Sequence, residues 1–131
     1  MITINLPTLE KSIGADDKLV VKEGEIKCAI DTSLMAEERW EQNFKHNAEK
    51  ETLFAYIERV QNAGLAESPA HVLSNLKALY CFIESDDLPD WKAFVRLFDL
   101  ASGDYLKRLC AQIKRVFEIA LSAATVDQKN S

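Results

Sequence analysis

The first thirty residues alternate between apolar and polar positions, which indicates extended structure. Residues 2–6 (Ile-Thr-Ile-Asn-Leu) carry an apolar side chain at every second position, as a strand with one buried face does. Residues 18–21 and 25–30 form two further extended runs, and residues 22–24 separate them. Gly24 can adopt the positive φ that a tight hairpin turn requires. The pattern predicts a small β-hairpin or meander, with Pro7 ending the first strand or placing it at a sheet edge.

From Ser33 onward the apolar positions recur every three to four residues, which predicts helices. Ala36, Trp40 and Phe44 form the stripe of the first helix, which Asp31, Thr32 or Ser33 can cap through a side-chain oxygen. About five short helices follow from the spacing, and tight breaks favour antiparallel packing of neighbours. The residues that mark these breaks are Asn47, Gly64, Ser68 with Pro69, residues 86–89 and Ser102 with Gly103.

The last helix has the clearest amphipathic pattern of the chain. Asp104 can cap it, and its apolar side runs from Leu106 to Ala120. Residues 125–131 are polar and are expected to form a flexible tail. The sequence therefore predicts one α+β domain, mostly α, over residues 1–131. It comprises a β-rich part over residues 1–30, a compact helical bundle over residues 33–124, and the tail.

Composition fits a folded domain and narrows the classes of partner. The chain has 131 residues, of which 47% are hydrophobic, enough for one core. A net charge of -5 disfavours duplex DNA or RNA as a partner, because such binding depends on neutralising phosphates. No apolar run approaches the roughly 20 residues that span a bilayer, and the N-terminus lacks the features of a signal peptide. We expect a soluble, cytoplasmic protein that binds neither nucleic acid nor membrane.

The sequence holds no recognisable catalytic or metal-binding motif. The four glycines are scattered, so neither a P-loop nor a dinucleotide fingerprint is present, and neither histidine has a partner at metal-ligand spacing. The three cysteines have no CxxC spacing and are expected to be reduced, half-buried thiols: Cys28, Cys81 and Cys110. We therefore expect no catalytic residues, cofactor, metal or small-molecule substrate, and a protein that is not an enzyme.

Some large apolar residues lie off the core-facing stripes of their helices. On a helical wheel Phe82, Leu97 and Leu100 fall to one side of the neighbouring apolar positions. Two interpretations remain open: a partner protein covers them, or a neighbouring helix does. Together with Trp40 and Phe44 they form the predicted partner-binding set.

One segment resembles a known family of phage proteins. Its residues are 30–33 (Ile-Asp-Thr-Ser), 36–41 (Ala-Glu-Glu-Arg-Trp-Glu), Asn43 with Phe44, and 51–59 (Glu-Thr-Leu-Phe-Ala-Tyr-Ile-Glu-Arg). This run, with a β-rich start before it and helices after it, resembles tail assembly chaperones of siphophages and prophages of Gram-positive bacteria. In relatives a Pro often follows the Phe, whereas Lys45 follows Phe44 here.

The resemblance implies a role in tail morphogenesis in the cytoplasm of the bacterial host. Such chaperones bind the long tape-measure protein, keep it soluble, recruit tail-tube subunits and are absent from the mature virion. The resemblance also implies that this chain is the shorter of two products, the longer one made by ribosomal frameshifting.

Charge is distributed unevenly along the chain. Residues 31–58 hold seven acidic and three basic side chains, whereas residues 104–121 hold four basic and two acidic ones. This complementarity predicts head-to-tail association of subunits into a ring or spiral. The residues expected to carry it are Glu37, Glu38 and Glu41 in one subunit and Lys107, Lys114 and Arg115 in the next.

Two other functions remain as alternatives. The first is another phage structural or adaptor protein, such as a head–tail connector or a tail component. The second is a small regulator that places its basic last helix on DNA, which salt-dependent binding to duplex would identify.

Overall fold

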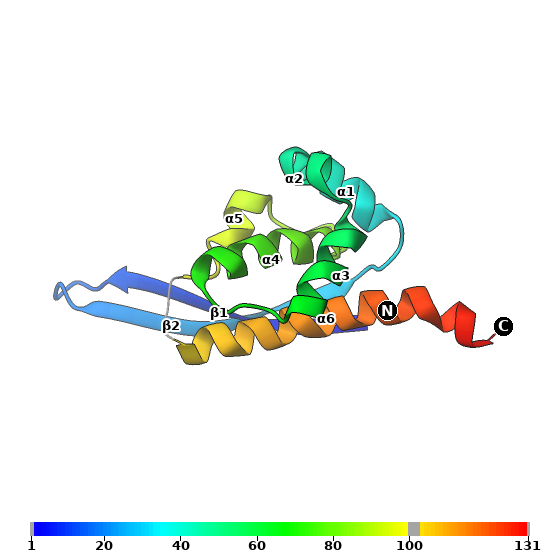
Figure 1. Cartoon of the computed structure of the whole chain (residues 1–131). Helices are drawn as coiled ribbons and strands as arrows, with labels where there is room; N and C mark the ends of the chain where they lie inside the picture. Colours follow the sequence, from blue (N-terminus) through cyan, green and yellow to red (C-terminus); the bar gives the residue numbers. More distant parts are fainter. Residues whose placement is uncertain (1, 100–102, 131) are drawn as a thin grey trace.

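The computed structural model describes residues 2–99 and 103–130, with side chains through Ser122. A two-stranded antiparallel sheet stands beside a layer of helices, which confirms the predicted α+β, mostly helical fold (Figure 1). The strands are β1 (Ile2–Ile13) and β2 (Leu19–Ile30). The helices in the described part of the chain are α1 (Met35–Asn43), α2 (Lys45–Lys50), α3 (Leu53–Ala63), α4 (Pro69–Cys81), α5 (Trp91–Val95) and α6 (Gly103–Asn130).

The hairpin is longer than predicted, and its turn lies elsewhere. The two strands pair in one register from Ile2 opposite Ile30 to Ile13 opposite Leu19. The turn spans residues 14–18, where the Gly14 N–H donates to the Lys18 carbonyl at 2.8 Å. The predicted turn at residues 22–24 is therefore wrong. Gly24 lies inside β2 opposite Thr8, where an added Cβ would come 3.0 Å from the Thr8 hydroxyl oxygen.

Pro7 does not end the first strand. The N–H and C=O groups of successive residues in a strand point to opposite edges, so residues two apart share an edge. Leu9, two residues further on, bonds through both groups to the segment at residues 97–99, away from β2. Position 7 has the same orientation, so the N–H that proline lacks would not have paired with β2.

Several helix boundaries follow from local residues as expected. Gly64 ends α3 with a φ of 83°, and Ser68 precedes Pro69 at the start of α4. The predicted restart at Asn47 is wrong, because Asn47 lies inside α2. Thr52 caps α3 instead, and its hydroxyl accepts from the Ala55 N–H at 3.1 Å.

The last helix extends further than its apolar pattern indicates. The backbone of α6 is helical through Asn130 and so includes residues 125–130 of the expected tail. Flexibility of that segment stays a prediction, and Ser131 lies outside the described residues.

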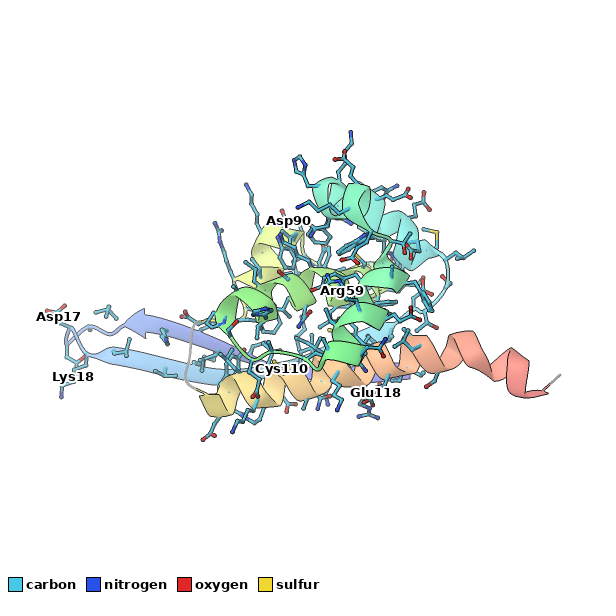
Figure 2. All side chains as sticks on the ribbon, in the orientation of Figure 1. Asp17, Lys18, Arg59, Asp90, Cys110 and Glu118 are labelled. Atoms are coloured by element: carbon cyan, nitrogen blue, oxygen red, sulfur yellow. The ribbon has the colours of Figure 1, made fainter. Side chains whose placement is uncertain are left out.

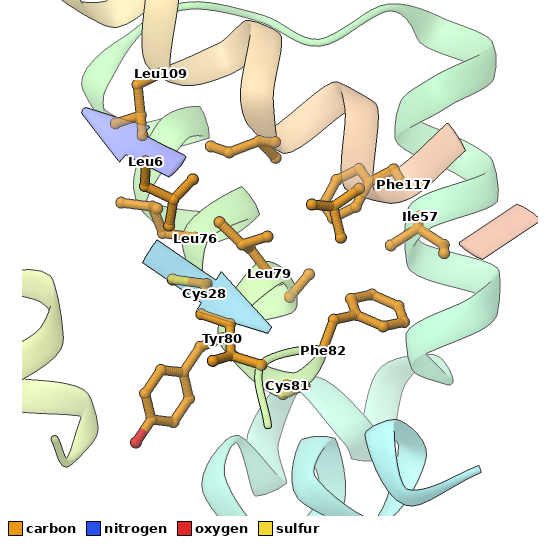
Figure 3. Packing of buried hydrophobic residues seen from close by; sticks show 14 of the residues in the cluster. Leu6, Cys28, Ile57, Leu76, Leu79, Tyr80, Cys81, Phe82, Leu109 and Phe117 are labelled. Carbon is orange, nitrogen blue, oxygen red and sulfur yellow. The ribbon is translucent and has the colours of Figure 1, made fainter. Parts of the chain in front are cut away.

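One core joins the hairpin to the helices. Helix α6 packs along β1, α3 and α4, and both strands contribute buried side chains (Figure 3). Leu6 and Cys28 come from the hairpin, Ile57 from α3, Leu79 from α4 and Phe117 from α6. All five side chains are almost fully buried. The inner half of the hairpin is therefore part of the core, whereas its outer half extends past the helices (Figure 1).

Candidate protein-binding site

Large apolar side chains are exposed where α1 and α3 begin. Leu34 is 85% exposed and Phe54 is 43% exposed, and Met35 beside Leu34 is exposed as well. Leu34 and Phe54 line an open cavity of about 300 Å³. Its other lining residues are mostly apolar: Ala36, Leu53, Ile57, Phe82 and Ala120, with Thr32, Ser33 and Glu37 as the polar members. We call this cavity and its exposed apolar side chains the apolar pocket.

The turn before α1 explains why Leu34 is exposed. Asp31 accepts a hydrogen bond from the Ser33 N–H at 2.9 Å, and the Ser33 hydroxyl accepts from the Met35 N–H at 3.3 Å. The predicted cap at Asp31, Thr32 or Ser33 is wrong, because the cap position is Leu34, which makes no side-chain cap bond. Ser33 still accepts from the free N–H of Met35 at the helix start. A leucine therefore occupies a position where polar residues are preferred, and its side chain points to solvent.

Arg39 ties this turn to the end of α4. Its guanidinium lies 3.3 Å from an Asp31 carboxylate oxygen and donates to the Cys81 carbonyl at 3.2 Å. Hydrogen bonds from Ser33 and the nearby Arg39 charge lower the pKa of Asp31, although partial burial opposes them. The turn that presents Leu34 is thus linked to the helix whose end supplies Phe82.

Glu37 sets the position of Phe54. One of its carboxylate oxygens accepts from the Leu53 N–H at 3.1 Å, and the other accepts from the Phe54 N–H at 2.8 Å. A carboxylate is favourable there because it satisfies free N–H groups at the positive end of the α3 dipole. Glu37 is half-buried and joins α1 to α3 within the chain, and its part in self-association stays a prediction.

Most of the predicted partner-binding residues are in the core. Trp40 and Phe44 are buried, and the Trp40 indole donates to the Glu51 carbonyl at 3.0 Å. Phe82 is only 4% exposed and packs against Phe117 of α6, with ring centroids 6.4 Å apart. A neighbouring helix therefore covers most of Phe82, as one of the two open interpretations has it, and contact of the remaining surface with a partner stays a prediction. Within the predicted set, Phe82 does line the apolar pocket, as part of its floor.

Leu97 and Leu100 are the remaining two residues of that set, and the structure describes only Leu97, which lies just after α5. Leu97 is half-buried, and its carbonyl accepts from the Leu9 N–H at 2.9 Å. Leu100 lies outside the described residues. Leu97 does not border the apolar pocket.

The other predicted self-association residues are exposed on separate helices. Glu38 and Glu41 lie on α1, whereas Lys107, Lys114 and Arg115 lie on the outer side of α6. Lys114 is 3.8 Å from Glu118 one turn along the same helix. Among residues 2–99 and 103–122, no ion pair joins the acidic set to the basic set. Contact between the acidic set of one subunit and the basic set of the next stays a prediction.

The cysteine thiols are poor nucleophiles in this fold. Burial raises the pKa of Cys28 to about 11 and that of Cys81 to about 12. Both thiols are therefore protonated at neutral pH. Within the part of the chain that the structure describes, no three His, Cys, Asp or Glu side chains are placed to hold one metal ion. None of the helices there is long and apolar enough to cross a membrane.

Comparison with protein-family models, with curated proteins and with solved structures finds no match for this chain. The assignment of the apolar pocket as a candidate binding site therefore rests on the geometry of this chain alone.

Proposed function

We propose that this protein is a non-enzymatic tail assembly chaperone that binds the tape-measure protein through the apolar pocket. The observation that carries the proposal is the exposed pair Leu34 and Phe54 at an open apolar cavity. Exposed apolar groups of this size, gathered at one place, are typical of surfaces that bind other proteins.

The apolar lining of the pocket suits an apolar helix as ligand. An amphipathic helix binds by inserting apolar side chains, spaced one turn apart, into a hydrophobic groove. Ile57 and Phe82 form a buried apolar floor, and Leu34 stands at the rim, where it can pack against an inserted side chain. A tape-measure protein is a long helical chain that needs its apolar surface covered before tail-tube subunits assemble around it.

The proposal includes the wider role that the sequence resemblance implies. The protein would recruit tail-tube subunits, work in the cytoplasm of the bacterial host and be absent from the mature virion. Subunits would also associate into a ring or spiral. With Glu37 engaged within the chain, Glu38 and Glu41 are left to meet Lys107, Lys114 and Arg115 of the next subunit.

Co-expression with the tape-measure protein encoded in the same genome tests the function. We expect the tape measure to become soluble and to co-purify with this protein. Leu34→Ser and Phe54→Ser should each reduce the soluble fraction severalfold. Leu73→Ser is the matched control, because Leu73 on α4 is as exposed as Phe54 but lines a different cavity.

The proposal fails if the tape measure stays insoluble beside a correctly folded wild-type protein. The proposed site fails if all three variants solubilise the tape measure as well as the wild type does. Circular dichroism of each variant separates loss of binding from loss of folding.

A further inference from the structure

The outer half of the hairpin exposes a cluster of aliphatic side chains. Ile13 is 65% and Leu19 is 61% exposed, and Val20 and Val21 are exposed beside them. The tip marked by Asp17 and Lys18 extends past the helices (Figure 2), and these residues follow it along the two strands. Val21 also borders a pocket that Tyr105 and Arg108 of α6 line. A two-stranded ribbon alone is marginally stable in water, and an exposed apolar strand is a template for pairing with another chain. We call this part of β2, residues 19–23, the outer strand.

The direction of the backbone groups shows which edge is open. Leu9 bonds to residues 97–99 through both its N–H and its carbonyl, so it points away from β2. Glu23 lies opposite Leu9. In an antiparallel ladder, the backbone N–H and carbonyl groups of two opposite residues point either both toward or both away from the partner strand. The backbone groups of Glu23 therefore also point away from β1, to the outer edge. Odd-numbered residues of β2 therefore direct their N–H and carbonyl groups to the outer edge.

Contacts near the body agree with this assignment. The Ala29 carbonyl accepts from the Glu84 N–H at 2.9 Å, and the Asp31 N–H donates to the Phe82 carbonyl at 2.7 Å. The segment at residues 82–84 thus covers the inner end of this edge. In the described structure, the backbone groups of residues 19, 21 and 23 have no hydrogen-bond partner on the edge.

We propose that a second copy of this chain binds here, with the outer strands of the two copies antiparallel and a two-fold axis at Val21. Leu19 of each copy then lies opposite Glu23 of the other, and Val21 lies opposite itself. Three outward-pointing pairs exchange two hydrogen bonds each, which gives about six new hydrogen bonds. This contact rests on the hairpin alone and does not depend on the proposed chaperone function.

Charge selects this register among those the edge allows. An axis at Val20 shortens the ladder to residues 19–21 and sets Lys18 opposite Lys22. An axis at Lys22 sets the Lys22 side chains of the two copies opposite each other. An axis at Glu23 likewise sets the two Glu23 carboxylates opposite each other. Like charges directly opposite each other destabilise a strand pair.

Registers nearer the body are excluded in the same way. An axis at Gly24 or Glu25 again sets glutamates opposite each other. An axis at Ile26 sets the partner against Ala29, whose carbonyl is already bonded to Glu84. With the axis at Val21 the ladder has no like-charge pair. Glu25 and Asp17 face each other only past its end, where both are exposed and salt screens them.

The same register joins the apolar faces of the two hairpins. Residues directly opposite each other share a face of the sheet, and Ile13 pairs with Leu19 inside each hairpin. Ile13, Leu19 and Val21 of both copies therefore lie on one face of a four-stranded sheet. The two helical bodies lie at opposite ends, because only the hairpin tips overlap.

Disulfide trapping tests the axis. Residues directly opposite in such a pair have Cα atoms about 5.5 Å apart, within reach of a disulfide. Under mild oxidation Val21→Cys should form a covalent dimer. Glu25→Cys is the matched control on the same edge, because the two copies of residue 25 would be about 26 Å apart. The native thiols are buried, which limits background reaction.

Sedimentation velocity tests the contact without a new covalent bond. We expect the wild type to sediment as a dimer or a larger assembly. Val21→Pro should lose the pair, because it removes an N–H that points outward and leaves the bonds to β1 intact. Val21→Thr keeps that N–H and should remain paired. A wild-type monomer, or equal trapping at positions 21 and 25, would overturn the proposal.

Discussion

The carboxylate of Glu37 accepts a hydrogen bond from the backbone N–H of Phe54 at 2.8 Å. A second bond, from the Leu53 N–H at 3.1 Å, makes Glu37 an anionic cap supplied to α3 by α1. The contact places the exposed Phe54 ring at the same cavity as Leu34. One carboxylate therefore both stabilises a helix start and shapes the mouth of the apolar pocket.

Loss of this cap should weaken the fold. Glu37→Ala removes the acceptor for two N–H groups, and we expect the free energy of unfolding to fall by about 1 kcal/mol. Glu38→Ala is the control, because Glu38 is exposed and bonds only to the Gln42 amide, on the same helix. Urea denaturation measures both. Equal stability of the two variants would show that the cap contributes nothing.

Asp31 should make stability depend on pH in the acid range. Its pKa is lowered in the folded protein, so the ionised form stabilises the fold above the unfolded value of about 3.9. This contribution is lost as the pH falls through the folded pKa. Asp31→Asn should therefore be less stable than the wild type at pH 7, with a difference that shrinks below about pH 4. Thermal melts across this range measure it, and a difference independent of pH would contradict the assignment.

A buried hydrogen bond links α3 to α4. The Tyr56 hydroxyl donates to the Asn75 side-chain oxygen at 2.7 Å, and Asn75 is 3% exposed. Tyr56→Phe leaves that oxygen unsatisfied, which should lower stability by about 1–2 kcal/mol. Tyr80→Phe should cost less, because its partner, the Pro89 carbonyl, belongs to a half-buried residue that water can reach. Chemical denaturation of both variants measures the free energy of unfolding. A larger loss of stability for Tyr80→Phe than for Tyr56→Phe would contradict this prediction.

The cysteines should be unreactive until the protein unfolds. All three are buried, and burial raises the pKa of each thiol. A disulfide-exchange reagent at pH 8 should label less than one thiol per native chain over minutes. The same reagent should label all three in denaturant. Rapid labelling of the native protein would show that a thiol is accessible.

Charge reversal on α6 tests the predicted head-to-tail contact. Lys114→Glu combined with Arg115→Glu should weaken assemblies larger than the hairpin-linked pair, because the acidic α1 surface would then be repelled. Lys92→Glu combined with Arg96→Glu is the matched control, because Lys92 lies on α5 and Arg96 directly follows it, and both are exposed. Sedimentation velocity at low salt measures both, and an unchanged distribution would place the second contact elsewhere.

The sequence predicted elements whose boundaries depend on nearby residues. Gly64 and Ser68 with Pro69 mark helix ends through local backbone preferences, and both predictions are confirmed. The hairpin turn depends instead on the pairing of two twelve-residue strands. Gly24 resembles a turn residue locally, but strand pairing places it inside β2. A single glycine could not reveal that register.

The candidate site was only partly visible in the sequence. Phe82 lies off its stripe as the helical wheel indicates, but Phe117, thirty-five residues later, covers it. Leu34 and Phe54 were missed although a signal existed. Leu34 is apolar directly before a helix, and Phe54 lies off the stripe of Leu53, Tyr56 and Ile57. The bond between Glu37 and Phe54 spans seventeen residues and leaves no comparable pattern.

Site-specific photo-crosslinking during co-expression tests the central claim most directly. A photoreactive phenylalanine analogue at position 34 should form a covalent adduct with the tape-measure protein, identified by mass spectrometry. The same analogue at position 73, on the exposed face of α4, should form little adduct. Equal crosslinking at both positions, or none at position 34 while the two proteins co-purify, would contradict binding through the apolar pocket.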